Sequence, residues 1–578
     1  MNPPRSPVFL PATSGVLLSL SLPPHPVALL APVALAPLAV ALARLPPTSE
    51  GTRQAAVAGI VAGGFHALLL LHWLPGAARP LLGLGLGSLA ALSVWGLNAV
   101  LTGLVTALVH RGASRGRLPL PVGLWAAWVV LGWAPSSLPR AGFPWLGPEA
   151  ALVGRPWLLG ASDLVGGAGV AGVLAFVGGA LGVGWVRLRR SRAPGGDADR
   201  PKVGAWWSWP AAAVGLASLV AGYGAVTGEP RGGSVDAPAP RVLTVAALSL
   251  DADPALLASP ERRNLELPRA LDRLREELHA GDAGLIVWPE SPTGTVGLEV
   301  EGRRAMEWAR GLDAPVAFGV LEPVRTGGGE SGSTELRRNR MRLAPSRGKP
   351  LPLLREKRRL LPLLEARPPP LDGSSEEGRG PVAIEVRTGE GTKLRGGSSA
   401  GRVPTPPPPE FAGATVSLPV GVLICFESLF GGEARRLRRD GAQLLLLPLN
   451  EGWLAGRGGG IFDAARSQHE AVVVLRAVEA RVPVIRSAVG GRAGVWNADG
   501  RALPHRIREV EGVGSVILAD VPLHERPGPL ASRGGAGALG LLSLLVLLAG
   551  AAVSIRSSGL PGPWGRRPPG PGSGFALS

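Results

Sequence analysis

The sequence predicts a polytopic α-helical membrane bundle of about eight spans joined to an exported α/β domain. Long charge-free apolar stretches fill residues 1–230, and one more lies near the C-terminus. Between them, short apolar runs alternate with helix-like segments, which is typical of strands buried between helices. We therefore expect a membrane domain at 1–230, an α/β domain at 238–527, a last span at 534–555 and a disordered cytoplasmic tail at 556–578.

The predicted spans match the thickness of a membrane. A hydrocarbon core about 30 Å thick requires roughly 20 mostly apolar residues in a helix. The candidate spans are residues 9–22, 26–43, 54–74, 82–109, 119–135, 165–186, 205–226 and 534–555. The first span is short and rich in serine, so a signal peptide is the alternative there. Further spans follow directly, however, and no convincing small-residue cleavage site separates them.

Arginines follow every even-numbered span. They are Arg44 and Arg53, then Arg111, Arg115 and Arg117, then Arg187, Arg189, Arg190 and Arg192, and finally Arg556, Arg566 and Arg567. Arginine-rich short loops stay in the cytoplasm. This distribution predicts eight spans with both ends inside, and it places residues 227–533 on the outer face of the membrane.

The formal net charge of +17 does not indicate a nucleic-acid-binding protein. The basic residues gather in short loops beside apolar runs, whereas nucleic-acid binding needs a basic face with interleaved aromatic residues. The single cysteine excludes an intramolecular disulfide. No histidine and cysteine cluster has the spacing of a metal site, so we expect no metal.

The exported region has its own order of elements. The expected strands are 241–250, 283–291, 315–320, 419–428, 442–450 and the segment "PVIRSAV", and the expected helices are 261–280 and 462–482. Residues 323–350 and 366–415 are rich in glycine, proline and arginine, and we expect them to be long surface loops that could act as lids.

Three reactive residues come at or near the ends of predicted strands: Glu290, Lys357 and Cys425. Together they could form a cysteine nucleophile, a carboxylate base and a cation that stabilises an oxyanion. A thiol is mostly protonated at neutral pH, so a cysteine nucleophile needs an acceptor for its proton. Rigid strand ends are where α/β enzymes hold such groups.

Each of these residues also has a structural interpretation. Cys425 could be a small core residue, Glu290 could cap a helix, and Lys357 lies in a basic run that could form a solvated face. Position 357 nevertheless holds lysine among arginines, in a chain with few lysines. A compact ammonium fits a tight oxyanion site better than a guanidinium does.

The motifs around these residues are "VWPES" at Glu290, "KRRLLPLLE" from Lys357 to Glu365, and "CFES" from Cys425. In this order, with seven predicted spans before the domain and one after it, they resemble the bacterial apolipoprotein N-acyltransferases of the nitrilase (carbon–nitrogen hydrolase) superfamily. Further matching positions are Asn450 and Trp453 in "NEGWL", Arg476, Glu479 and Arg486, and "GFPWL" at 142–146.

The resemblance implies a nitrilase-like αββα sandwich and a role for each site residue. Cys425 would be the nucleophile, Glu290 the general base and Lys357 the stabiliser of thiolate and oxyanion. Glu365 and Glu427 would orient this group as supporting carboxylates. Phe426, Asn450 and Trp453 would be possible substrate-binding residues.

The resemblance also implies the reaction and its location. An acyl chain would move from a membrane phospholipid, through a thioester on Cys425, to the α-amine of the diacylglyceryl-cysteine of an apolipoprotein. The enzyme would lie in the bacterial inner membrane, with its catalytic domain at the periplasmic face, and would need no cofactor or metal. Nothing in the sequence demands an oligomer, so we expect a monomer. Its partners would be the phospholipid, the apolipoprotein and the bilayer.

Some positions depart from the family pattern. Leu363 and Leu364 replace a Phe-Gly pair, Phe426 replaces a tyrosine and Val489 replaces an asparagine. Two alternatives therefore accompany the transferase interpretation. One is a membrane-anchored amidase or other nitrilase-type hydrolase with the same three residues, and the other is a non-catalytic membrane scaffold.

Overall fold

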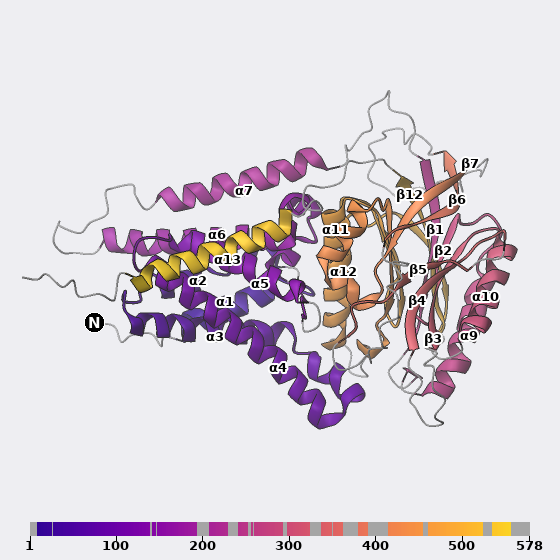
Figure 1. The fold of residues 1–578 in the computed structure, drawn as a ribbon, viewed down its shortest axis with the longest axis horizontal. Coiled ribbons are helices and arrows are strands. Elements are labelled where there is room, and N and C mark those ends of the chain that lie inside the picture. The colour runs from indigo at the N-terminus through magenta and orange to yellow at the C-terminus, as the bar shows by residue number, and fades with distance from the viewer. Residues whose placement is uncertain are drawn as a thin grey trace, which may run out of the picture.

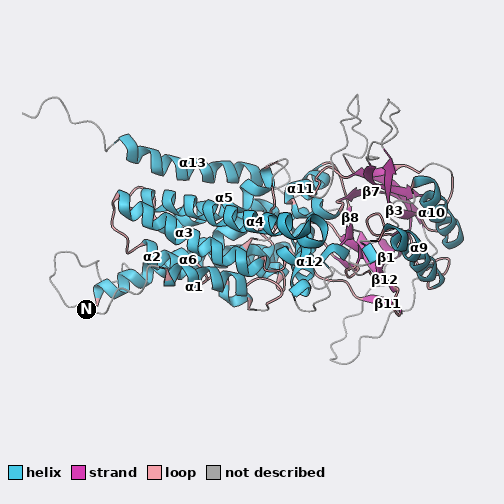
Figure 2. Ribbon diagram, turned by 90° about the horizontal axis from the view of Figure 1, so that it is seen from below, coloured by secondary structure: helices cyan, strands magenta, loops and turns pink. Residues whose placement is uncertain are grey.

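The described chain consists of a long helical bundle and a strand-rich domain that lie end to end (Figure 1). The turned view in Figure 2 shows the same separation, with helices α11 and α12 between the bundle and most of the strands. The structure is a computed structural model that describes residues 8–25, 27–138, 142–145, 147–192, 207–228, 241–252, 256–257, 259–292, 297–323, 337–348, 351–361, 380–390, 414–454, 461–523 and 535–556.

Helices lie at the positions of the predicted spans. They are α1 (Phe9–Leu20), η1 (Ala28–Leu30), α2 (Ala36–Leu42), α3 (Ser49–Leu70), α4 (Leu74–Ala113), α5 (Leu120–Ser137), α6 (Ser162–Ser191), α7 (Ser208–Thr227) and α13 (Gly535–Arg556). Within the described residues, four helices are long and apolar enough to cross a membrane: α3, residues 82–113 of α4, α6 and α7. The total of eight spans stays a prediction.

The second predicted span, residues 26–43, is wrong as one continuous helix. The chain there forms the short helix η1, a run of turns and the seven-residue helix α2. Pro32 and Pro37 explain the interruption, because proline lacks an N–H and clashes with the preceding helical turn. Pro37 falls in the first turn of α2, where that N–H is not needed.

The bundle packs through small residues and exposes leucines. A Cβ atom added to Gly59 of α3 would lie 2.0 Å from the Thr106 hydroxyl of α4, so the two helices approach closely only because glycine stands there. Leu89 and Leu104 of α4 are each 58% exposed, and Leu219 of α7 is 73% exposed. An outer surface of leucines belongs in lipid, and these helices make the chain a multi-pass membrane protein.

The strands of the strand-rich domain are connected by hydrogen bonds in one continuous series. Its strands are β1 (Arg241–Leu250), β2 (Leu285–Val287), β3 (Val316–Pro323), β4 (Arg337–Ala344), β5 (Leu353–Glu356), β6 (Val382–Glu390), β7 (Ala414–Val422), β8 (Leu444–Asn450), β9 (Val484–Val489), β10 (Gly494–Trp496), β11 (His505–Val510) and β12 (Gly514–Leu523). Their order is β10-β9-β8-β7-β6-β1-β2-β3-β4-β5, and β12 joins β1 to β11. Strand β1 is central, since it pairs with β2, β6, β9 and β12.

Helices cover the strands on two sides. Helices α9 (Pro260–Glu276) and α10 (Leu298–Leu312) lie away from the bundle, whereas α11 (Gly431–Arg439) and α12 (Ile461–Ala480) lie next to it (Figure 1). Ala246 and Leu248 of β1 belong to the core cluster that contains α9 and α10, while Val245 and Ala247 belong to the cluster that contains α12. The predicted α/β layering is present, and the division of the strands into an αββα sandwich stays a prediction.

Two strands lie in ranges predicted to be surface loops. Strands β4 and β6 fall within 323–350 and 366–415, and the loop prediction is wrong for both. In β4, buried Met341 alternates with Arg340, whose guanidinium donates to Glu322 at 2.6 Å and to Glu356 at 2.8 Å. The arginines that suggested a loop are thus paired with glutamates on the neighbouring strands.

Gln468 of α12 fastens the domain to the bundle. Its side-chain oxygen accepts from the indole nitrogens of Trp73 at 3.0 Å and Trp145 at 2.7 Å. Its side-chain nitrogen donates to the carbonyl oxygen of Leu70 at 3.0 Å. All three partners lie in the membrane half of the chain, so one buried amide is held by three groups of the bundle.

Arg481 makes a second fastening at the end of α12. Its guanidinium bonds at 2.9 Å to Asp163 of α6 and at 2.9 Å to Asp499 of the domain. It also donates to the carbonyl oxygen of Gly160 and the hydroxyl of Thr227. One buried cation therefore joins α6, α7 and the domain.

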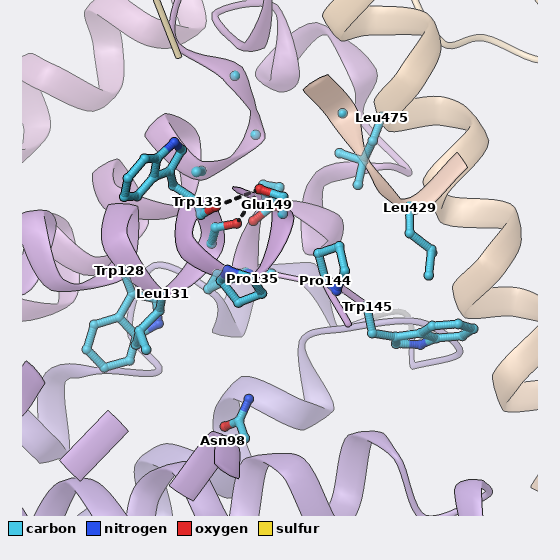
Figure 3. Close-up of a pocket in the computed structure, with 18 of the residues that line it drawn as sticks. Asn98, Trp128, Leu131, Trp133, Pro135, Pro144, Trp145, Glu149, Leu429 and Leu475 are labelled. Carbon is cyan, nitrogen blue, oxygen red and sulfur yellow. Dashed lines mark hydrogen bonds between the residues drawn. The ribbon is translucent and has the colours of Figure 1, made fainter. Parts of the chain in front are cut away.

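Glu149, in the short helix η2 (Pro148–Leu152), is a buried carboxyl at the same junction. It lines a pocket of about 170 Å³, where Leu429 and Leu475 of the domain face Pro144, Trp145 and Glu149 (Figure 3). Burial raises the pKa of Glu149 to about 7, and the positive charge of Arg476 only partly opposes this rise. The folded protein therefore holds a proton that an unfolded chain would release above its ordinary pKa of 4.5.

This proton predicts a pH-dependent stability. Because the folded state binds more protons between the two pKa values, stability should decrease as pH rises through that window, by about 3 kcal/mol, and stay lower above it. Glu149→Gln mimics the protonated carboxyl, so its melting temperature should exceed that of the wild type at pH 8 and match it near pH 4.5. Thermal unfolding in detergent measures this difference, with the exposed Glu50→Gln as control. An equal difference at both pH values would contradict the prediction.

Candidate active site

Glu290 and Lys357 meet in a buried contact. Lys357 Nζ lies 2.7 Å from Glu290 Oε1, and the two side chains are 2% and 4% exposed. Asn339 of β4 donates to the same oxygen at 2.6 Å. A solvated face at Lys357 is therefore excluded, and so is a helix cap at Glu290, which follows strand β2. No local motif surrounds Asn339, so its place beside Glu290 is not predictable from the sequence.

Gly319 explains how the chain brings Glu290 to this place. Strand β3 runs beside the turn that follows β2. A Cβ atom at Gly319 would lie 2.4 Å from the backbone nitrogen of Ser291 and 3.1 Å from the Cα atom of Glu290. Only glycine lets the turn approach β3 so closely.

Cys425 occupies a strained turn after β7. It opens the 3-10 helix η6 (Cys425–Leu429), is 8% exposed, and has a φ of 49°. Residues other than glycine rarely adopt this left-handed conformation, and such strain is concentrated at functional sites. The backbone thus distinguishes Cys425 from an ordinary core residue.

Glu427 ties the Cys425 turn to the segment that carries Lys357. Its carboxylate accepts two hydrogen bonds from Arg355, at 2.7 and 3.0 Å, and one from the backbone N–H of Arg358 at 2.9 Å. It also accepts from the backbone N–H of Ile424 at 3.0 Å. Arg355 and Glu427 are both 0% exposed, and the pKa of Arg355 is raised because two glutamates outweigh the effect of its burial. Glu427 and Arg355 thus hold the Cys425 turn against the segment that carries Lys357, and no motif in the sequence marks Arg355.

Phe426 lies among aromatic rings of both halves of the chain. The centroid of its ring lies 6.1 Å from the ring centroid of Phe143, in the "GFPWL" segment, and 5.4 Å from that of Phe430. Phe143 in turn stacks on Trp145 at 5.5 Å. Aromatic rings from the membrane half therefore reach the turn that carries Cys425.

The other predicted site residues are less defined. Asn450 ends β8, and its side chain accepts from the backbone N–H of Gly452 at 3.3 Å. Trp453 lies in the helix η7 (Gly452–Leu454). Glu365 falls outside the described residues. Among the described residues, no group of three or more histidine, cysteine, aspartate or glutamate side chains could hold a metal ion.

The bundle and the site define a class: a multi-pass membrane protein with an α/β domain that carries a buried glutamate–lysine pair near a cysteine turn. Residues 14–180 match the family model described as apolipoprotein N-acyltransferase N-terminal domain. This match confirms the resemblance to apolipoprotein N-acyltransferases.

Curated relatives and solved structures are similar to parts of the chain. An apolipoprotein N-acyltransferase of Bradyrhizobium diazoefficiens is 35% identical over 159 residues, which are 27% of this chain and 27% of that protein. One of Geobacter metallireducens is 37% identical over 81 residues, 14% of each chain. A carbon–nitrogen hydrolase of Helicobacter pylori G27 is 14% identical, with a TM-score of 0.31, over 52% of this chain and 94% of that chain. The chain thus matches well under half of the curated relatives' own length.

The buried pair of Arg355 and Glu427 predicts a large effect on stability. Arg355→Met leaves the Glu427 carboxylate without its cation, which should cost about 3–5 kcal/mol and lower the melting temperature. Adding Glu427→Gln should recover part of the loss, because the unpaired charge is removed. The control is Arg262→Met, whose partner Glu266 is exposed and whose loss should cost under about 1 kcal/mol. Equal melting temperatures for Arg355→Met and the control would refute this role.

Proposed function

We propose that the protein is an apolipoprotein N-acyltransferase that uses Cys425, Glu290 and Lys357. The observation that carries the proposal is the desolvated contact of 2.7 Å between Glu290 and Lys357, next to a segment bonded to the Cys425 turn. A base and a cation held together in a site shielded from water suit the chemistry of a cysteine nucleophile. The membrane bundle beneath the site suits substrates that are anchored in lipid.

In the first half-reaction, Cys425 attacks the ester carbonyl of a phospholipid acyl chain, and Glu290 takes the thiol proton. Lys357 stabilises the negative oxygen of the tetrahedral intermediate, helped by the backbone N–H of Phe426. The intermediate collapses to a thioester on Cys425, and the lyso-phospholipid leaves with the proton from Glu290. Each proton that Glu290 accepts in attack is thus returned to the leaving group.

In the second half-reaction, the α-amine of the diacylglyceryl-cysteine of an apolipoprotein attacks the thioester. Glu290 accepts a proton from the amine, the C–S bond breaks, and the Cys425 thiol is restored. The arginines that follow the even-numbered predicted spans support an orientation with the domain on the periplasmic face of the bacterial inner membrane. Exclusion of water would protect the thioester from hydrolysis until the amine arrives.

Acyl labelling tests the proposal directly. Wild-type protein incubated with phospholipid labelled in its acyl chain should acquire a label that hydroxylamine removes, and Cys425→Ala should acquire none. Because the chain has a single cysteine, the site of the label is unambiguous. Glu290→Gln and Lys357→Met should slow labelling by about 100-fold or more. Melting temperatures of all variants show that they are folded.

Two outcomes would replace this function with another. An unlabelled wild type that releases ammonia from small amides would identify a nitrilase-type amidase. A Cys425→Ala variant that restores lipoprotein N-acylation in depleted cells as well as the wild type does would identify a scaffold.

A further inference from the structure

Behind Cys425 lies a chain of buried polar side chains that the proposed chemistry does not use. Ser428 Oγ lies 2.7 Å from the carbonyl oxygen of Cys425 and 3.1 Å from Nε2 of His469. His469 Nδ1 lies 2.6 Å from Glu451 Oε1, and Arg486 donates to the other oxygen of Glu451 at 2.5 Å. We call Ser428, His469, Glu451 and Arg486 the charge relay. It begins at the backbone of the cysteine and ends at an arginine on β9.

The side chains of the charge relay are buried, and the backbone packs closely against them. Ser428 and Glu451 are 0% exposed, His469 is 4% exposed and Arg486 is 1% exposed. A Cβ atom at Gly491 would lie 1.9 Å from Glu451 Oε2, so glycine is required for the chain to pass this carboxylate. Buried polar groups are costly unless they are all paired, which makes a complete chain of contacts informative.

The hydrogen bonds link each member of the charge relay to the next. A carbonyl oxygen can only accept, so the Ser428 hydroxyl donates to the carbonyl oxygen of Cys425. Burial would raise the pKa of Glu451, but Arg486 and His469 lower it to about 2, so Glu451 is a carboxylate. His469 bridges the Ser428 hydroxyl and the Glu451 carboxylate through its two ring nitrogens.

Polar and aromatic groups hold the ring of His469. The Glu451 carboxylate, the Ser428 hydroxyl and the indole of Trp145 lie next to it, with Arg486 beyond the carboxylate. The centroids of the Trp145 and His469 rings are 5.8 Å apart. Trp145 belongs to the membrane half, so the bundle contributes to this environment.

We propose that Ser428, His469 and Glu451 are positioning residues, which hold the strained Cys425 turn and polarise the peptide bond between Cys425 and Phe426. The hydroxyl bond to the Cys425 carbonyl makes the N–H of Phe426 a stronger donor, because hydrogen bonds in a chain strengthen one another. That N–H is the backbone donor in the proposed acyl transfer, and a stronger donor there also favours the Cys425 thiolate. The inference rests on the proposed function for the acyl step, but not for the thiolate.

Two single variants test the charge relay. Ser428→Ala removes the link to the Cys425 carbonyl, and His469→Gln removes the imidazole ring that bridges Ser428 and Glu451 while keeping a polar side chain. Each should lower kcat of acyl transfer about tenfold, a fraction of the effect of deleting an oxyanion donor, and leave KM for phospholipid unchanged. Ser428→Thr keeps the hydroxyl and should retain the wild-type rate.

A second readout does not depend on the acyl donor. The rate at which iodoacetamide alkylates Cys425, measured against pH, has its midpoint at the pKa of the thiol. Ser428→Ala and His469→Gln should each raise this midpoint, because a less polarised Phe426 N–H is a weaker donor to the thiolate. Thr244→Val is the matched control, since it also removes a buried hydroxyl. Thr244 lies in β1 just before the residues that pair with β2, whereas Glu290 follows the other end of β2.

The outcomes separate the two proposals. A wild type that takes no acyl label refutes the proposed function, while its alkylation midpoint still tests the charge relay. Wild-type acylation and alkylation in both Ser428→Ala and His469→Gln would overturn the charge relay. So would a Ser428→Thr variant that is as slow as Ser428→Ala at an unchanged melting temperature. If one of the two variants does not fold, the other decides.

Discussion

The buried ion pair between Arg355 and Glu427 is the interaction on which the rest of the site depends. Glu427 lies two residues after Cys425, and Arg355 lies two residues before Lys357. Their two hydrogen bonds, together with the bond from the Arg358 backbone, fix one chain segment against the other. Each of these two charged groups would be costly to bury alone, and the pair of hydrogen bonds between them offsets that cost. The positions of Cys425 and Lys357 are thus set by a pair that takes no part in the proposed chemistry.

The strands that were predicted correctly are those whose own residues form a continuous apolar run. Continuous apolar runs at β1, β8 and β9 indicate buried strands, and these strands are present. Strand β4 was missed because its arginines are neutralised by Glu322 and Glu356 from other strands, which no local pattern reveals. The prolines at 32 and 37 were visible, but apolar composition alone does not distinguish a continuous helix from a broken one.

The same distinction holds for the site. Glu290 and Lys357 were predicted from motifs, and the structure brings them together. Asn339 and His469 come from distant segments and are recognised only when their partners lie beside them. Glu451 stands inside the quoted "NEGWL" segment, yet its bonds to His469 and Arg486 depend on the pairing of β8 with β9. Sequence reasoning finds reactive groups, whereas the groups that orient them are set by tertiary contacts.

Gln468 and Arg481 have a mechanical consequence. Swinging the domain away from the bundle would break three hydrogen bonds of one amide and the ion pair of one guanidinium with Asp163. Each buried bond left unmade costs about 1–3 kcal/mol, so a rocking motion of whole domains is disfavoured. In the proposed reaction, the lipid-anchored donor and acceptor would therefore reach Cys425 through movements of side chains and short segments, without separation of the domain from the bundle.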